Sequence, residues 1–275
     1  MLQVLGNVDR RIIYIAIAVA VAAPLVWPIG LPLDVNANTE AMFKLIENLK
    51  PGDKVLFPID FLSASADTAL PQGEALARHL MRRPGIKIVA MSFNDQGHLF
   101  ADRILAAAQS KDKQYGIDYI NLGFIAGGEG SLAGFLSNIR SVVKADYTGK
   151  PVDSFPIMQG INSVNDFQLV IGTIMSVQVG ETAWIRQMGA QKVPFAFGTA
   201  SASYTSWIPF VQSGQIKALL DGLRGAAEYE KLIDFPGRAT KAMDAQSVGH
   251  LLIILLIVLG NIGYVVEKSN GKKQR

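Results

Sequence analysis

Two carboxylates lie at or just after the ends of short apolar segments of the chain and could act together. Asp60 lies within the segment KVLFPIDF, and Asp95 follows the segment IKIVAMSF. Two carboxylates brought to one place can bind a divalent cation or carry out acid–base catalysis. Carboxylates that follow strands also cap the next helix or accept hydrogen bonds from loop amides. Both interpretations remain open at this point, so the pair is a candidate site without an assigned reaction.

The stretch IAGGEGSLAGFL, residues 125–136, is a second candidate. Gly128, Gly130 and Gly134 follow an apolar run and open a segment with helical character. A dinucleotide fingerprint needs the spacing G-x-G-x-x-G at the first strand-to-helix turn. Here the last spacing is one residue longer and the turn is the third, and Glu129 adds negative charge where a pyrophosphate would bind. The pattern favours a structural turn, and we expect no cofactor.

The sequence lacks the residue patterns of cysteine, metal-dependent and serine catalysis. The chain has no cysteine, which excludes disulfides, thiolate metal sites and cysteine nucleophiles. Its histidines, His79, His98 and His250, lie on separate segments without the spacing of a metal-binding motif, so we expect no metal site. The serine-rich stretches lack the G-x-S-x-G pattern of serine hydrolases.

Short apolar segments recur along the middle of the chain and are the elements that would position these residues. Each has the length of a strand and is followed by a segment with helical periodicity. This alternation is typical of a parallel sheet covered by helices on both faces. We therefore predict a Rossmann-like, doubly wound α/β domain with a mostly parallel sheet of about five strands, whose order stays open. The predicted strands lie within residues 54–61, 86–93, 118–124, 167–175 and 193–200.

Ligands of open parallel sheets bind beyond the carboxyl ends of the strands. Because parallel strands end at the same edge, the polar residues that follow them should converge there. The candidate ligand-binding residues are Asp60, Ser63, Asn94, Asp95, Gly128, Gly130, Ser131, Ser176, Glu181, Thr199 and Ser201.

Both ends of the chain are strongly apolar. Residues 12–33 and 247–266 each contain about 20 residues without a formal charge, enough for a helix to cross a bilayer. We predict one N-terminal and one C-terminal transmembrane helix flanking the domain. For the first segment a cleaved signal peptide is an alternative, since AVA at 20–22 resembles a cleavage site. For the second, the alternative is a buried core helix.

The distribution of charge predicts how the chain crosses the membrane. The two tails hold six basic and two acidic residues, whereas the middle holds 20 basic and 21 acidic residues. Basic residues beside membrane helices favour the cytoplasmic side. The middle has a net charge of −1, which gives no indication of nucleic acid binding. We predict a cytoplasmic tail at 1–11, a helix at 12–33, an extracytoplasmic domain at 34–246, a helix at 247–266 and a cytoplasmic basic tail at 267–275.

Small residues in the predicted membrane helices suggest contacts with other helices. Gly260 and Gly263 allow close approach, and Asn261 could donate a hydrogen bond across a helix pair. Ala16 and Ala20 are similarly small in the first helix. We expect the second helix to form contacts in a homo-oligomer or hetero-oligomer, although the two helices could also pair with one another or face lipid.

The closing region, residues 222–264, and the opening LGNVDRRIIY, residues 5–14, resemble an uncharacterised family of bacterial membrane proteins. The resemblance covers most of the chain and is one of overall pattern. It implies two terminal transmembrane anchors around an extracytoplasmic Rossmann-like domain at the cell membrane. It implies no reaction.

The missing catalytic motifs and the near-neutral middle region favour a protein that is not an enzyme. We expect a doubly anchored extracytoplasmic binding or scaffold subunit of an oligomeric membrane assembly, with a partner protein or a small molecule as ligand. The alternative is a membrane-anchored hydrolase or transferase that uses Asp60, Asp95 and the loop amides near Gly128.

Overall fold

The computed structural model describes residues 9–176 and 179–273. The chain divides into two compact units. One is an α/β domain, Leu33–Ala239, and the other is a helical unit made of the two chain ends, 1–32 and 240–275.

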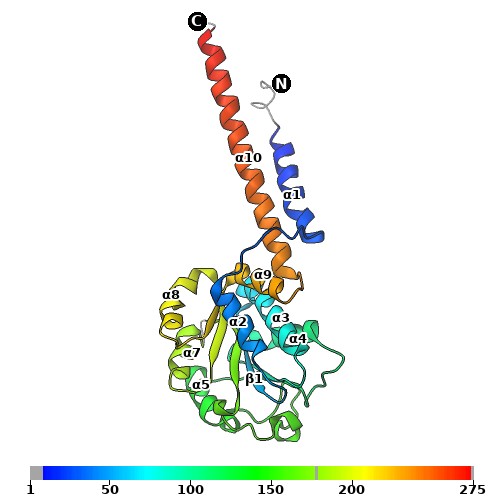
Figure 1. Ribbon diagram of the computed structural model, residues 1–275, viewed down its shortest axis with the longest axis vertical. Coiled ribbons are helices and arrows are strands. Elements are labelled where there is room, and N and C mark those ends of the chain that lie inside the picture. The colour runs from blue at the N-terminus through cyan, green and yellow to red at the C-terminus, as the bar shows by residue number, and fades with distance from the viewer. Residues whose placement is uncertain (1–8, 177–178, 274–275) are drawn as a thin grey trace. The chain divides into compact units, whose positions relative to one another are not determined.

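The α/β domain is built on a six-stranded sheet in the order β3-β2-β1-β4-β5-β6, in which every neighbouring pair is parallel (Figure 1). This is the strand order of the dinucleotide-binding Rossmann fold, so the predicted Rossmann-like α/β class is confirmed. The strands are β1 (Lys54–Phe61), β2 (Lys87–Ser92), β3 (Tyr119–Phe124), β4 (Leu169–Met175), β5 (Phe195–Thr199) and β6 (Ala218–Asp221).

The prediction of about five strands missed β6. The sequence of residues 205–233 favours helix, interrupted near Ser213 and Gly214. Instead, β6 lies between α8 (Ser201–Gln212) and α9 (Gly222–Leu232). Its four residues are too few to display a periodicity, and they are apolar until Asp221. Pairing with the edge of β5 decides the conformation, which is a tertiary effect.

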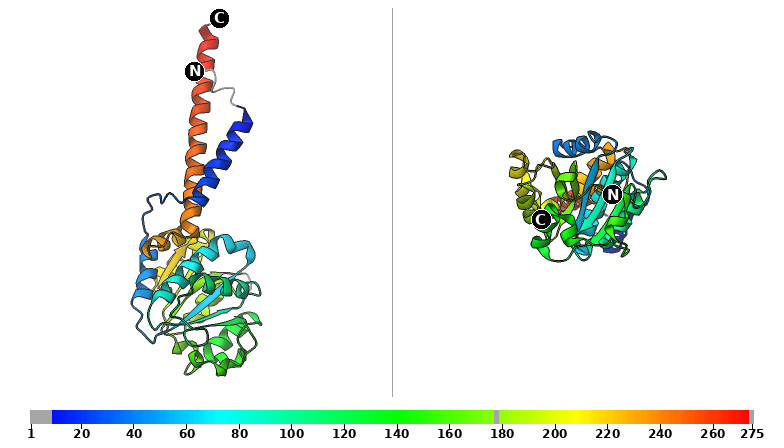
Figure 2. Two further views of the ribbon diagram at one scale, coloured as in Figure 1. Left: turned by 90° about the vertical axis from the view of Figure 1, so that its right-hand side faces the viewer. Right: turned by 90° about the horizontal axis from the view of Figure 1, so that it is seen from below.

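Helices cover both faces of the sheet, and each face has its own apolar core (Figures 1 and 2). One face carries α2 (Ala37–Glu47), α3 (Ala66–Arg82), α4 (Gly97–Ala108) and α9. The other carries α5 (Gly128–Ser137), α6 (Ile139–Val142), α7 (Glu181–Met188) and α8. Short 3₁₀ turns lie at Ser63–Ser65, Val152–Ser154, Pro156–Met158 and Val164–Asp166.

The central strand β1 contains a proline, which is unusual because proline cannot donate to a strand ladder. The register between β1 and β4 runs through Leu56 with Val170 and resumes at Ile59 with Thr173, skipping the proline. Gly172 lies against Pro58, and a Cβ there would come within 2.0 Å of the Pro58 carbonyl oxygen. A glycine at this position therefore lets the two central strands approach.

The helical unit contains α1 (Arg10–Val26) and the long α10 (Arg238–Lys273). The first helix ends earlier than the predicted 12–33, because a proline disfavours helical backbone in the residue before it, and Pro28 follows Trp27. Likewise α10 begins well before the predicted 247.

In the described part of the chain, one helix is long and apolar enough to cross a membrane, and that stretch is Arg238–Val265 of α10. The 17 residues of α1 would span only about 25 Å, against about 30 Å of hydrocarbon. The N-terminal helix therefore does not meet the length of a span by itself.

Candidate functional site

Asp60 lies where the strand order reverses, the usual ligand position in this fold. It is close to the end of β1 and pairs in register with Ile174 of β4. From β1 the chain crosses to β2, and from β4 it crosses to β5 on the other side. Since all six strands are parallel, the residues that follow them lie at one edge of the sheet, which we call the carboxyl edge.

The carboxylate of Asp60 is fully buried and already hydrogen-bonded. Oδ1 accepts from the Ser92 hydroxyl at 2.9 Å and from the Phe93 backbone N–H at 2.5 Å. Oδ2 accepts from the indole N–H of Trp184 at 2.8 Å. These donors come from β2, the residue after it, and α7, so the carboxylate joins three parts of the domain.

Burial raises the pKa of Asp60 to about 6, and the hydrogen bonds from Phe93, Trp184 and Ser92 oppose that rise. The surroundings accommodate both protonation states. The Ser92 Oγ lies 2.9 Å from Asp60 Oδ1 and 3.0 Å from the Asn94 carbonyl oxygen, with one proton to donate. When Asp60 is protonated it can donate to Ser92, whose hydroxyl then turns to Asn94.

Trp184 covers Asp60 from α7. Its side chain is completely buried, with the indole stacked on Phe195 and edge-on to Phe93, both at 5.9 Å between ring centres. Because the carboxylate is fully buried, a ligand could reach it only if the surrounding side chains moved. Among the described residues, Ser92, Phe93 and Trp184 therefore enclose the Asp60 carboxylate.

A hydrogen bond between Asn94 and Ser176 links the ends of β2 and β4. The Asn94 side-chain amide donates to the Ser176 hydroxyl at 3.0 Å. Because β2 and β4 flank β1, this bond passes across the end of β1. Asn94 also accepts from the backbone N–H groups of Gln96 and Gly97, at 2.9 and 3.3 Å, which satisfies the start of α4.

The glycine-rich turn between β3 and α5 has the contacts of a structural turn. Gly127 and Gly128 adopt positive φ angles of 111° and 62°, which other residues rarely adopt. Glu129 accepts hydrogen bonds from Arg186 and Gln187 of α7, which lower its pKa. The acidic side chain thus binds the neighbouring helix. Gly130 is exposed, and the Ser131 hydroxyl donates to the Ala126 carbonyl at 2.6 Å.

The remaining predicted residues are distributed along the same edge. Thr199 is buried at the end of β5, and its hydroxyl donates to Glu181 at 2.8 Å. Ser201 is exposed at the first position of α8. Ser63 is exposed after β1, where its N–H donates to the side chain of Gln96 at 2.8 Å.

The two carboxylates of the first candidate pair have different surroundings. Asp60 is enclosed by protein, whereas Asp95 is exposed to solvent. Among the described residues, no group of three or more histidines, cysteines or carboxylates could hold a metal ion.

Sequence reasoning missed the side chains that fix this edge. Trp184 lies 124 positions from Asp60, and no local pattern connects the two. Gln72 of α3 donates to the carbonyls of Thr199 and Gly222, at 3.1 and 2.7 Å, and so joins the ends of β5 and β6. The Gln72 amide packs directly against Gly198. A Cβ at that position would lie 2.1 Å from Gln72 Oε1, so a larger residue would clash. A glycine opposite a buried glutamine is the one signal available, and it is weak.

A surface hollow of about 500 Å³ lies at the opposite, amino edge of the sheet. It is bordered by residues that precede β4 and β5, away from every predicted site residue. Its polar border includes Asn165, Gln168, Gln191 and Lys192.

The small residues of α10 have different environments. Gly249 faces α1, since a Cβ there would lie 3.4 Å from a methyl group of Val21. Gly263 is buried, whereas Gly260 is exposed with open space around it. The exposed Asn261 donates to the Ile257 carbonyl of its own helix at 2.9 Å.

No protein-family model matches the chain, and comparisons with curated proteins and with solved structures found no significant match.

Proposed function

We propose that the chain is a binding or scaffold subunit, anchored in the cell membrane by both ends, with its α/β domain outside the cytoplasm. The observation that carries this proposal is the enclosed carboxylate of Asp60 at the carboxyl edge. It accepts hydrogen bonds from three donors, and Trp184 covers it. A carboxylate enclosed in this way suits a domain that acts through its surface.

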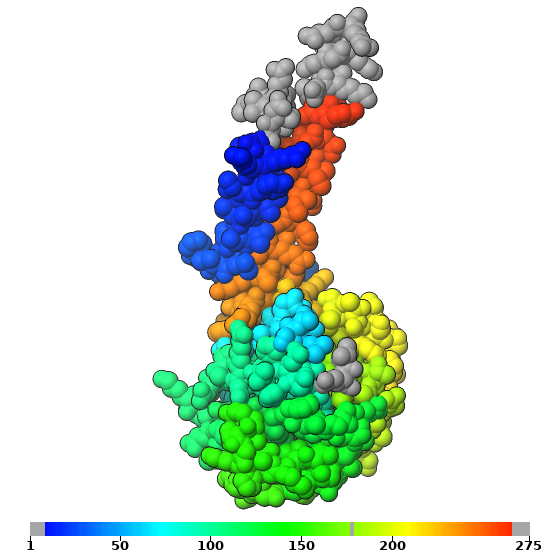
Figure 3. All heavy atoms as spheres, turned by 180° about the vertical axis from the view of Figure 1, so that it is seen from behind, coloured from blue at the N-terminus to red at the C-terminus, as the bar shows by residue number. Residues whose placement is uncertain are grey.

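Contacts within the helical unit support two-ended anchoring. The Asp244 carboxylate of α10 accepts from the backbone N–H groups of Ile29, Gly30 and Leu31, at 2.8, 2.8 and 3.0 Å. Asp244 is 3% exposed, so these bonds are shielded from water. The ribbon and space-filling views show α1 alongside α10 (Figures 2 and 3). A helix too short to span alone can insert when it pairs with a longer one.

Contacts within the α/β domain suit the same arrangement. The buried Glu228 of α9 accepts from the Asn36 N–H at 3.0 Å and from the Thr39 hydroxyl at 2.7 Å. Lys231 donates to the Leu33 carbonyl at 2.6 Å. The chain therefore enters and leaves the domain at neighbouring places, as it must if two paired helices hold it.

Asymmetric charge supports the orientation, because the basic residues flanking the apolar segments lie in the two tails. The exposed side of α10 at Gly260 and Asn261 is the proposed contact with other subunits. In a bilayer, an asparagine side chain is more stable when it is hydrogen-bonded to a neighbouring helix than when it faces lipid.

One observation favours an enzyme instead. A buried carboxyl group with a pKa near 6 has the property of a catalytic acid or base. A hydrolase or transferase acting through Asp60 would have to expose this buried carboxylate during each turnover. The proposed binding or scaffold role needs no such movement.

The native mass of the full chain tests the proposal. After solubilisation in mild detergent and, separately, in lipid nanodiscs, we expect an assembly larger than a single copy in both. A single copy in both would contradict the subunit assignment.

A further inference from the structure

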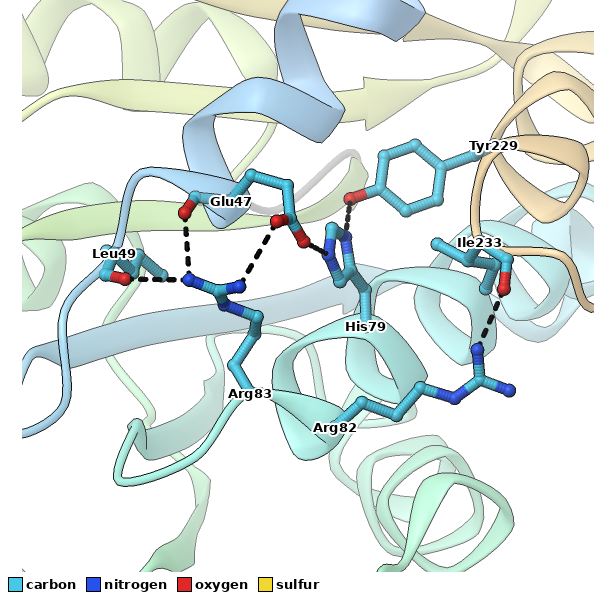
Figure 4. Close-up of polar contacts among 7 residues, drawn as sticks. All are labelled: Glu47, Leu49, His79, Arg82, Arg83, Tyr229 and Ile233. Atoms are coloured by element: carbon cyan, nitrogen blue, oxygen red, sulfur yellow. Dashed lines mark hydrogen bonds and ion pairs between the residues drawn. The ribbon is translucent and has the colours of Figure 1, made fainter.

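Three helices on one face of the domain meet at a buried histidine (Figure 4). His79 of α3 lies between Glu47, the last residue of α2, and Tyr229 of α9. Its Nε2 is 2.7 Å from Glu47 Oε1, and its Nδ1 is 2.7 Å from the Tyr229 hydroxyl. Phe43 of α2 stacks on the imidazole at 4.7 Å between ring centres. The histidine thus holds α2 and α9 against α3.

The partners define the protonation state of the ring. The Glu47 carboxylate can only accept, so Nε2 carries the proton in that bond. Nδ1 of the neutral ring then accepts from the Tyr229 hydroxyl. Tyr229 is fully buried, and within the described part of the chain its hydroxyl makes no other hydrogen bond. When His79 is neutral, both ring nitrogens and the Tyr229 hydroxyl therefore take part in hydrogen bonds.

A second proton on His79 would disrupt the contact between His79 and Tyr229. Nδ1–H would then point at the Tyr229 oxygen, and the hydroxyl proton would lose the one acceptor that it has among the described residues. An unsatisfied buried hydroxyl is destabilising. The added charge would also be buried, which is unfavourable without full compensation.

The charged groups around the ring come from two helices. Glu47 of α2 favours the charged imidazole, but it is shared with Arg83 of α3, whose guanidinium lies 3.1 Å from Glu47 Oε2. Arg83 also donates to the carbonyls of Glu47 and Leu49, at 2.8 and 3.0 Å. Arg82 donates to the Ile233 carbonyl at 2.8 Å. Burial is the largest influence and lowers the pKa of His79, Glu47 opposes that shift, and the two arginines add to it.

We propose that His79 is an acid-sensitive clamp on the two ends of the α/β domain: the neutral ring fastens α2 and α9 to α3, and protonation loosens them. The first helix of the domain is α2, and α9 precedes the turn that leads to α10. A loosened clamp would therefore free the segments through which the domain joins the helical unit. The contacts among Glu47, His79 and Tyr229 lie within the α/β domain and are independent of the proposed function.

The sign of the effect follows from proton linkage. A histidine whose folded pKa is below its ordinary value of 6.5 binds more protons in the opened state than in the closed one. Its stabilising contribution is present above about pH 6.5 and declines as the pH falls towards the folded pKa. Opening of α2 and α9 should therefore increase in mild acid.

Hydrogen exchange of the full chain in nanodiscs measures that opening. We expect amides in α2 and α9 to exchange severalfold faster at pH 5.5 than at pH 7.5, after correction for the intrinsic effect of pH. In His79→Gln the side chain can still donate to Glu47 and accept from Tyr229, but it does not titrate. Its exchange should lose this pH dependence, whereas the control His98→Gln should keep it.

Exchange of the imidazole C2 proton in the wild type gives each histidine's pKa separately and needs no variant to fold. We expect the pKa of His79 to lie below 6.5 and to rise in Tyr229→Phe, which removes the donor to Nδ1. A His79 pKa at or above 6.5 would overturn the clamp. So would an unchanged pH response of α2 and α9 in His79→Gln.

Discussion

At the level of single residues, the buried carboxylate of Asp60 makes the stability of the domain depend on pH. Its folded pKa of about 6 is above its ordinary value of 3.8. The folded state therefore holds the proton more tightly than the unfolded chain. The corresponding stability is fully present below about pH 3.8 and is lost as the pH rises through 6, in total about 3 kcal/mol.

Asp60→Asn should remove this dependence, because the amide does not titrate. Between pH 7.5 and pH 4.5, we expect the free energy of unfolding of the wild type to rise by about 2 kcal/mol relative to the variant. Urea unfolding of the full chain, followed by circular dichroism at both pH values, measures it. Comparison with the variant cancels the opposite contribution of His79.

The exposed Asp95→Asn serves as the matched control and should follow the wild type at both pH values. Parallel profiles for wild type and Asp60→Asn would show that Asp60 does not hold a proton near neutral pH.

Trp184→Phe tests the cover over Asp60. Phenylalanine keeps an aromatic ring between Phe93 and Phe195 but cannot donate to the carboxylate. Loss of a hydrogen bond to a charged group should reduce the free energy of unfolding by about 1.5–3 kcal/mol at pH 7.5. The decrease should be smaller at pH 4.5, where Asp60 is neutral. An equal decrease at both pH values would assign the effect to packing alone.

At the level of elements, the strands before β6 were predictable because each is a short apolar run bounded by glycine, proline or polar residues. The carboxyl edge followed from the parallel sheet, so the position of Asp60 was predictable too. Its partners were not, because contacts such as that between Asp60 and Trp184 depend on how α7 packs over the sheet. The strand β6 was missed because its four residues carry no period of their own.

The link between the two ends of the chain rests on Asp244. Asp244→Ala leaves the N–H groups of residues 29–31 without their acceptor. We expect faster hydrogen exchange and earlier protease cleavage at residues 27–33. The exposed Gln246→Ala, on the same helix, should leave both unchanged. Equal protection in the two variants would show that Asp244 does not hold this loop.

The exposed side of α10 is the proposed contact between subunits. Gly260→Leu with Asn261→Leu adds bulk and removes the amide, so we expect a smaller native mass in nanodiscs with an unchanged circular dichroism spectrum. Leu255→Ile, exposed on the side of α10 away from Gly260 and Asn261, should keep the parent mass. If parent and double variant have the same mass, this side of α10 is not the contact.

At the scale of the whole molecule, the chain consists of a Rossmann-like domain and a helical unit made from both chain ends. The carboxyl edge of the domain is held by the bond between Asp60 and Trp184 and by the bond between Asn94 and Ser176. The paired ends depend on Asp244 and on the approach of Val21 to Gly249. We propose that both ends anchor the chain and leave the domain outside the cytoplasm.

Cysteine labelling in intact cells tests this topology, because the sequence contains no cysteine of its own. Single cysteines replace Asn7 in the first tail, Lys111 on the surface of the domain and Ser269 in the last tail. With a membrane-impermeant thiol reagent, we predict that Lys111→Cys is labelled in intact cells. Asn7→Cys and Ser269→Cys should be labelled only after the membrane is opened. Labelling of either tail in intact cells, or protection of Lys111→Cys, would show that the proposed topology is wrong.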